Sequence, residues 1–256
     1  MTAHRNLHIE NSRRSRNARP LSLPALAATV LLSLAAAVSL TACQNVATYV
    51  QPSLVRVIDA SYSAPAIDVS VENQQLGANL GLGSITAYGT VTAEGAATVS
   101  VAPVGSTSAL VSTTASLLAG QQHTVFLTDN GATPASYNLT ILTDQLTPAP
   151  NGQSAFRFLN QALKAGAVDV YLVPSGATLA NTVPIVTNLA AGAVSAYISF
   201  PSQSVTMVIT PTGVTTSKYS SPVIALYGGE VRTVLILDTK LTTNPPVNAI
   251  LTDDAD

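Results

Sequence analysis

Apolar and polar residues alternate with a period of two along most of the chain that follows residue 54. The alternation recurs in both halves, at Val55/Val57, Ile67/Val69/Val71, Val99/Val101, Val125/Leu127, Val168/Val170/Leu172, Val205/Met207/Ile209 and Val234/Ile236. Successive side chains of a strand point to opposite faces, so this period predicts strands with one buried face. No stretch of this region keeps a helical period between helix caps.

Turn-forming residues separate the alternating runs. Asp129-Asn130-Gly131 and Pro211-Thr212-Gly213 are examples, and residues of these types adopt the backbone conformations of tight turns. About six or seven short strands in each stretch of roughly 100 residues predict an all-β chain. The expected fold is two tandem antiparallel β-sandwiches of immunoglobulin-like size.

The chain also repeats itself. Arg56 and Asp68 recur as Arg157 and Asp169, both displaced by 101 positions. Later matches are displaced by 109 positions, among them Tyr88 with Tyr197, Gly120–Asp129 with Gly229–Asp238, and Ile141–Asp144 with Ile250–Asp253. The change of offset predicts an eight-residue insertion within Pro174–Asn188. The predicted domains are residues 54–144 and 155–253, joined by a Pro-containing linker at residues 145–154.

The first 42 residues have the layout of a secretory signal, with basic residues up to Arg19 and then an apolar run over residues 21–40. Leu40, Thr41 and Ala42, followed by Cys43, resemble the lipobox of bacterial lipoproteins. The resemblance implies cleavage before Cys43 and lipid attachment to its thiol, so residues 1–42 would be the signal peptide and residues 43–53 a tether. Attachment through several acyl chains holds a protein stably at a membrane. Gln44, and not Asp, follows the cysteine, which is similar to lipoproteins that are sent on to the outer membrane. There the protein would face the periplasm or the surface.

Two other interpretations of the leader stay open. The first alternative is an ordinary signal peptide that is cut at another position. The second is an uncleaved membrane helix, since the apolar run approaches spanning length. Cys43 is the only cysteine, so a lipidated Cys43 leaves none for a disulfide, and stability must come from the buried core.

Charge divides the chain into two unlike parts. The first 42 residues carry a net charge of +4 and the remainder carries −6. The second part has no cluster of Lys and Arg, and phosphate binding needs one, so nucleic acid is excluded as a partner.

Residues that could carry chemistry are few. After Cys43 the only histidine is His123, whose counterpart in the second copy is Arg232, and we predict a solvent-facing strand position for it. Zinc or iron sites need several His or Cys, so no metal and no cofactor are expected. Carboxylates suffice for calcium, but Asp129-Asn130-Gly131 is more simply a turn, and Asp253, Asp254 and Asp256 a solvated tail.

The duplicated Arg56/Asp68 and Arg157/Asp169 are the most specific polar features. We predict that each is a structural pair, a bidentate bridge between adjacent strands that fixes their register. The alternative is a pair of charges that binds a ligand.

Val55-Arg56-Val57-Ile58-Asp59-Ala60-Ser61, with Ala64-Pro65-Ala66-Ile67-Asp68-Val69, resembles the opening of the bacterial domain of unknown function 4397 family (DUF4397). The resemblance covers most of residues 54–144 and, more weakly, residues 155–253. It implies an exported or lipid-anchored envelope protein with immunoglobulin-like sandwiches and no assigned activity. Asp59 and Asn160 stand where the family often has His, so a role of that His does not transfer to this chain.

The sequence therefore predicts a non-enzymatic envelope protein, anchored in the membrane through the lipid on Cys43, with a binding or scaffolding role. Its partner would be an envelope protein or polysaccharide that the sequence does not specify. One alternative is an accessory module that binds polysaccharide through exposed Tyr side chains. Another is a hydrolase that uses carboxylates such as Asp59 and Asp68.

Overall fold

The computed structural model describes residues 51–92, 95–131, 135–239 and 247–254, and all of these residues fall in one compact unit. The predicted cleavage motif Leu40, Thr41 and Ala42 and the predicted lipid site Cys43 lie outside the described residues. No helix of the described part is long and apolar enough to cross a membrane.

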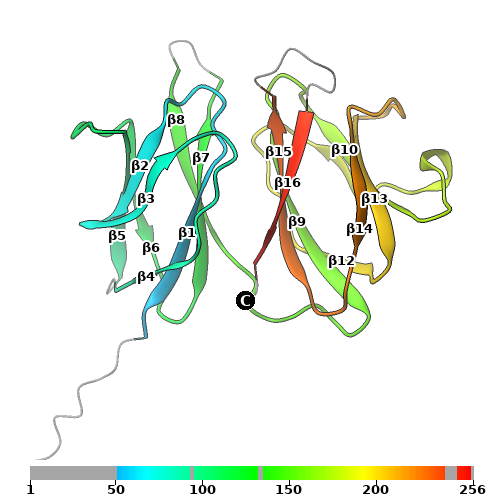
Figure 1. The fold of residues 1–256 in the computed structure, drawn as a ribbon, viewed down its shortest axis with the longest axis horizontal. Helices are drawn as coiled ribbons and strands as arrows, with labels where there is room; N and C mark the ends of the chain where they lie inside the picture. Colours follow the sequence, from blue (N-terminus) through cyan, green and yellow to red (C-terminus); the bar gives the residue numbers. More distant parts are fainter. Residues whose placement is uncertain (1–50, 93–94, 132–134, 240–246, 255–256) are drawn as a thin grey trace, which may run out of the picture. The chain divides into compact units, whose positions relative to one another are not determined.

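Sixteen strands and one short 3-10 helix form the described part of the chain (Figure 1). The first eight strands are β1 (Ser53–Asp59), β2 (Ile67–Val71), β3 (Gln74–Leu80), β4 (Gly89–Val91), β5 (Ala96–Pro103), β6 (Val111–Ser116), β7 (Gln122–Asp129) and β8 (Tyr137–Thr143). The others are β9 (Gln153–Gln161), β10 (Val168–Pro174), β11 (Val186–Leu189), β12 (Ile198–Pro201), β13 (Ser204–Pro211), β14 (Tyr219–Ala225), β15 (Val231–Asp238) and β16 (Val247–Asp253), and the helix is η1 (Leu179–Asn181).

The strands form four sheets of four strands each, in two sandwich-like units, as the alternation predicts (Figure 1). The first unit consists of sheet A, in the order β4-β1-β7-β8, and sheet B, in the order β3-β2-β5-β6. The second unit consists of sheet C, in the order β12-β9-β15-β16, and sheet D, in the order β11-β10-β13-β14. Each strand of the first unit thus has a counterpart at the same place in the second.

The sheets are not purely antiparallel. β1 pairs with β7, and β9 with β15, in parallel, while all the other described strand pairs are antiparallel. The residues between the partners supply the long crossover that a parallel pair needs, because a tight hairpin joins only antiparallel strands. The prediction of an all-β sandwich is confirmed, with this parallel pair in each unit.

Each unit has its own core between its two sheets. Val55, Val57, Val69 and Val125 are fully buried in the first core, and Phe158, Val170, Ile209 and Val234 in the second. All of these residues except Phe158 belong to the alternating runs of the sequence, so the period-two pattern identified these inward-facing positions correctly.

A third apolar cluster lies on the other faces of sheets A and C. This cluster includes Ile58 and Phe126 of sheet A and Leu159 and Leu235 of sheet C, and each of these side chains is at most 1% exposed. The outward face of each of these sheets is therefore covered by the outward face of the other, and the central strands β1, β7, β9 and β15 are buried on both sides. Sheets A and C form the contact between the two sandwiches.

The predicted insertion lies in the connection between β10 and β11. In the first unit the corresponding strands β2 and β3 are joined by a two-residue turn at residues 72–73, whereas the second unit has residues 175–185 there, including η1. Leu179 of η1 packs on the outer face of sheet D against Tyr171, Val173 and Val208. The extra residues therefore cover an apolar surface of sheet D.

Candidate functional site

The predicted bridges Arg56–Asp68 and Arg157–Asp169 do not form. Arg56 is on β1 of sheet A and Asp68 on β2 of sheet B, so the two strands belong to different sheets. Asp68 Oδ1 instead accepts a hydrogen bond from the backbone N of Asn79 at 2.9 Å. The counterpart Asp169 accepts from the backbone N atoms of Asn188 at 2.7 Å and Gly213 at 2.9 Å.

Both aspartates support an irregular stretch of the neighbouring strand. Asn79 and Asn188 have φ of 52°, a left-handed conformation that Asn tolerates better than most residues. The ladders β2–β3 and β10–β11 both shift register beside the aspartate. Asp68 and Asp169 are therefore structural residues, but their carboxylates bind backbone N–H groups beside a β-bulge and do not pair with the arginines.

Arg56 reaches into the second sandwich. Its Nη2 forms an ion pair with Asp254, its Nη1 donates to the carbonyl of Asp253 at 2.5 Å, and its Nε donates to Thr124 Oγ1 at 2.7 Å. Arg56 and Asp254 are 3% and 0% exposed, so both charges are removed from water. Asp254 lies one residue beyond the predicted end of the second domain.

Arg157 makes the corresponding contacts in the opposite direction. Its Nη2 bonds to Asp144 Oδ1 at 2.5 Å, its Nη1 donates to the carbonyl of Thr143 at 3.2 Å, and its Nε donates to Thr233 Oγ1 at 3.0 Å. The arginine of each sandwich thus pairs with the aspartate of the other. We call these two ion pairs the crossed pairs.

Two tyrosines link the crossed pairs to each other. The guanidinium of Arg56 lies 4.8 Å from the ring centroid of Tyr88, and Arg157 lies 4.7 Å from that of Tyr197. The Tyr88 hydroxyl donates to Asp144 and the Tyr197 hydroxyl to Asp254, both at 2.8 Å. Burial, with the nearby carboxylate, raises the pKa of both tyrosines well above the ordinary value, so both keep the proton that they donate.

The ladders correct the sequence alignment by one residue. Thr124 of β7 is opposite Leu142 of β8, whereas its counterpart Thr233 of β15 is opposite Thr252 of β16. Asp144 therefore corresponds to Asp254 and not to Asp253, since the second connection is one residue longer. Tyr88, Thr124 and Asp144 and their counterparts repeat in the sequence, and this repetition was the signal that could have identified them.

His123 is not solvent-facing, contrary to the prediction. It is 2% exposed, and its Nε2 accepts a hydrogen bond from the backbone N of Leu118 at 3.2 Å. Burial is the main cause that lowers its pKa, and the charge of Asp144 opposes it. His123 is therefore a neutral residue at the end of a strand that is covered on both faces.

Asp59 and Asn160, which replace the histidine frequent in the family, occupy equivalent buried positions at the ends of β1 and β9. Asp59 Oδ1 accepts from the backbone N of Ser61 at 2.9 Å, and Asn160 Oδ1 accepts from that of Ala162 at 3.0 Å. Both side chains thus shape the turn that follows their strand. Asp59 and Asp68, the pair considered for hydrolysis, lie on strands of two different sheets.

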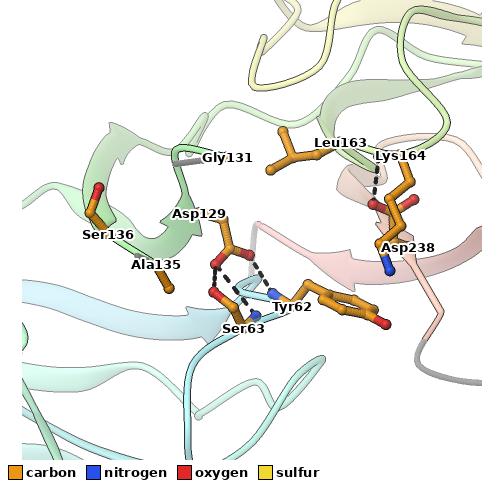
Figure 2. Close-up of a pocket in the computed structure, with 9 residues that line it drawn as sticks. All are labelled: Tyr62, Ser63, Asp129, Gly131, Ala135, Ser136, Leu163, Lys164 and Asp238. Carbon is orange, nitrogen blue, oxygen red and sulfur yellow. Dashed lines mark hydrogen bonds between the residues drawn. The ribbon is translucent and has the colours of Figure 1, made fainter. Parts of the chain in front are cut away.

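A cavity of about 510 Å³ opens where the end of β7 approaches the end of β15. We call it the junction cavity (Figure 2). Its lining comes from both sandwiches and consists of Tyr62, Ser63, Asp129, Gly131, Ala135, Ser136, Leu163, Lys164 and Asp238. A volume of this size is typical of small-molecule sites.

Asp129 holds one wall of the junction cavity in place. Its carboxylate accepts hydrogen bonds from Ser61 Oγ at 2.9 Å, from the backbone N of Tyr62 at 2.5 Å, from the backbone N of Ser63 at 3.4 Å and from Ser63 Oγ. Its carbonyl accepts from Gln161 Nε2 of the second sandwich at 3.0 Å. Asp129, one of the two calcium candidates, is therefore engaged by the turn at residues 61–63 of the same sandwich.

The opposite wall carries charge of both signs. Asp238 Oδ2 accepts from the backbone N of Lys164 at 2.8 Å, and Lys164 Nζ lies 3.9 Å from the ring centroid of Tyr62 (Figure 2). A hydrogen bond with Tyr62 raises the pKa of Lys164, so the ammonium is charged at neutral pH.

The other calcium candidate is also engaged within the fold. Asp254 is buried and bound to Arg56, and is not part of a solvated tail as predicted, while Asp256 lies outside the described residues. Within the part of the chain that the structure describes, no three His, Cys, Asp or Glu side chains gather in a way that could hold a metal ion.

A profile of the domain of unknown function family DUF4397 matches residues 53–171. The match covers all of β1–β8 and extends through β9 to Tyr171 in β10. A search of curated proteins finds no match for this chain. By its sequence and by the strands that the match covers, the chain contains a DUF4397 domain at residues 53–171.

Proposed function

We propose that this chain is a lipid-anchored protein of the bacterial cell envelope with a non-catalytic binding role, and that its two sandwiches are tandem DUF4397 repeats. The observation that carries the proposal is the lipobox-like Leu40-Thr41-Ala42-Cys43 at the end of a signal-like leader, close to the first strand of the fold. A cysteine at this position becomes the N-terminus after cleavage and carries the lipid.

The tether is short. Nine residues lie between Cys43 and Ser53 at the start of β1, and fully extended they span at most about 35 Å. Anchoring would therefore hold the folded part near the bilayer surface, where envelope components are within reach.

The tandem character is supported by the matching strand orders of the two sandwiches and by the crossed pairs. Each sandwich has a buried arginine with a tyrosine ring against its guanidinium. Each also has an aspartate that pairs with the arginine of the other sandwich. A binding role is supported by the junction cavity, since its lining combines charged, aromatic and aliphatic side chains at a volume suited to a small ligand.

The anchor is tested by metabolic labelling with a fatty-acid probe. We expect the full-length protein to incorporate the probe and to fractionate with membranes, and the Cys43→Ala variant to lose both properties. Gln44→Ala is the control, because it changes the adjacent residue and leaves the thiol in place, so its labelling should equal that of the unaltered protein. Equal labelling of Cys43→Ala would contradict the anchor.

A further inference from the structure

We propose that the junction cavity binds a small ligand that carries a protonated amine, and that Asp238 is the acceptor for that amine. The proposal rests on the binding role proposed above and is independent of the lipid anchor. Its basis is a comparison between the two copies of the same wall of the cavity.

Asp129 and Asp238 are equivalent residues at the ends of β7 and β15, yet their carboxylates have different surroundings. In the first copy, the turn at residues 61–63 supplies Asp129 with two hydroxyl donors, Ser61 Oγ and Ser63 Oγ, besides its backbone N–H groups. In the second copy the equivalent residues are Ala162 and Lys164, and neither has a hydroxyl. Asp238 keeps one donor there, the backbone N of Lys164 on Oδ2.

The other oxygen of Asp238 has no donor among the described residues. Oδ1 is buried without a hydrogen-bond partner in that part of the chain, and the residue is only 4% exposed. A buried carboxylate oxygen without a donor is destabilising, so this position favours a donor from outside the described residues. Asp238 lines the junction cavity, so a ligand there can supply the donor once the carboxylate turns its buried Oδ1 toward the cavity (Figure 2).

The charges around the cavity favour a cationic donor. Its lining includes two carboxylates and one ammonium, which leaves a net charge of −1. No ion pair within 4.0 Å joins Lys164 to Asp238, and among the described groups the ammonium lies over the ring of Tyr62 instead. A hydroxyl and an ammonium can both donate to the carboxylate, but only the ammonium adds the attraction of an opposite charge, so an amine fits Asp238 better than a hydroxyl.

The walls indicate the rest of the ligand. Leu163, Ala135 and Tyr62 offer apolar surface, while Ser63 and Ser136 offer hydroxyls. A compact ring with polar substituents and one amine matches this lining, as in an amino sugar.

The test uses the full-length protein, purified in detergent, and compares glucosamine with glucose, which differs only by a hydroxyl in place of the amine. Binding is followed by calorimetry and by NMR shifts of residues around the cavity. We expect glucosamine to bind about tenfold or more tightly than glucose, and Asp238→Asn to remove this preference. Glu230→Gln is the control, since this carboxylate contacts Arg232 and does not line the cavity.

A second variant guards against misfolding of Asp238→Asn. The double substitution Ala162→Ser/Lys164→Ser gives the second copy the hydroxyls of the first, so Asp238 should be satisfied within the chain. We expect this variant to remain folded and to lose the preference for glucosamine.

Equal affinity for the two sugars, or a preference for glucosamine that persists in both cavity variants, would overturn the proposal. Cyclohexylamine tests the amine without the sugar, and if neither amine shifts residues around the cavity the site takes no amine. If Asp238→Asn or Ala162→Ser/Lys164→Ser changes the stability while no sugar or amine binds the unaltered protein, the proposal is also overturned, and water is the donor to Asp238. None of these results depends on labelling of Cys43, so the two proposals fail separately.

Discussion

At the scale of single residues, the crossed pairs place buried opposite charges between the two sandwiches. Burying an arginine and an aspartate is costly, and the cost is recovered only when the geometry is good and the remaining polar atoms are satisfied. Here a threonine hydroxyl, a backbone carbonyl and a tyrosine hydroxyl surround each pair. The pairs therefore join sheets A and C through buried charges whose polar atoms are bonded on both sides of the contact.

Removing one partner should be far more damaging than removing both. We expect Asp254→Ala to lower the free energy of unfolding by about 3–5 kcal/mol, because it leaves Arg56 buried without a counter-charge. Urea denaturation followed by circular dichroism measures this, with Arg56→Met/Asp254→Leu expected to recover much of the loss.

The matched control for this prediction is Glu230→Ala. It removes one of the two carboxylate partners of Arg232, whose side chain is 18% exposed, and pairs near the surface contribute about 1 kcal/mol or less. An unfolding midpoint of Asp254→Ala that equals that of Glu230→Ala would show that the buried pair does not hold the sheets together.

His123 makes the stability depend on pH. Burial lowers its pKa below the ordinary value of 6.5, so the folded state favours the neutral ring more strongly than the unfolded chain does. Its contribution is complete above about pH 6.5 and is lost as the pH falls below that value towards the pKa in the folded state. Protonation of Nε2 also removes the acceptor for the backbone N of Leu118.

We expect the unfolding midpoint in urea to fall between about pH 7.5 and pH 5.5, a range in which unperturbed carboxylates stay ionised. His123→Gln should flatten this part of the profile, because Gln does not titrate. A profile that keeps the same slope in His123→Gln would assign the pH dependence to other groups.

At the scale of elements, the central strands differ from the half-buried strands that the sequence predicts. β7 is buried at all eight positions, because its Val125 and Leu127 face the sandwich core while Thr124 and Phe126 face sheet C. The alternating pattern marks only one of these two faces. Phe126 lies on the face of β7 that the alternation assigns to solvent. A large apolar residue at such a position indicates that this face is also covered, here by sheet C.

The insertion between β10 and β11 is an element with a packing role. Leu179 of η1 is partly buried against Tyr171, Val173 and Val208, whereas Val183 in the same connection is 85% exposed. The first sandwich has Ser70 and Ser100 at the positions of Tyr171 and Val208, so its outer face needs no such cover.

We expect Leu179→Gln to lower the free energy of unfolding by about 1 kcal/mol, since partial burial of a Leu contributes roughly half of the full value. Val183→Gln is the matched control and should leave the thermal midpoint unchanged. Equal midpoints for the two variants would mean that Leu179 does not stabilise sheet D.

At the scale of the whole molecule, the two sandwiches exchange contacts through equivalent surfaces. Sheet A supplies Arg56, Asp144 and Tyr88, and sheet C supplies Arg157, Asp254 and Tyr197 in the same roles. Equivalent residues from the two copies thus meet at one interface. The junction cavity lies at this interface and takes part of its lining from each copy.

The sequence by itself predicted the strands and the turns, and its internal matches pointed to the correspondence between the strand orders of the two sandwiches. These features depend on local properties, namely the period of side-chain directions along a strand, the turn chemistry of Gly, Asn and Asp, and the spacing of like residues. The DUF4397 resemblance was visible in the same local motifs, and the family match at residues 53–171 agrees with it.

Only the tertiary structure decided which polar residues meet. Arg56 pairs with Asp254, which is 198 positions away, and not with the nearby Asp68. His123 is buried and Asp238 lines a cavity because the outward faces of sheets A and C cover one another. Such contacts depend on how two separately formed sheets pack, and the period of a single strand contains no information about the surface that will cover its second face.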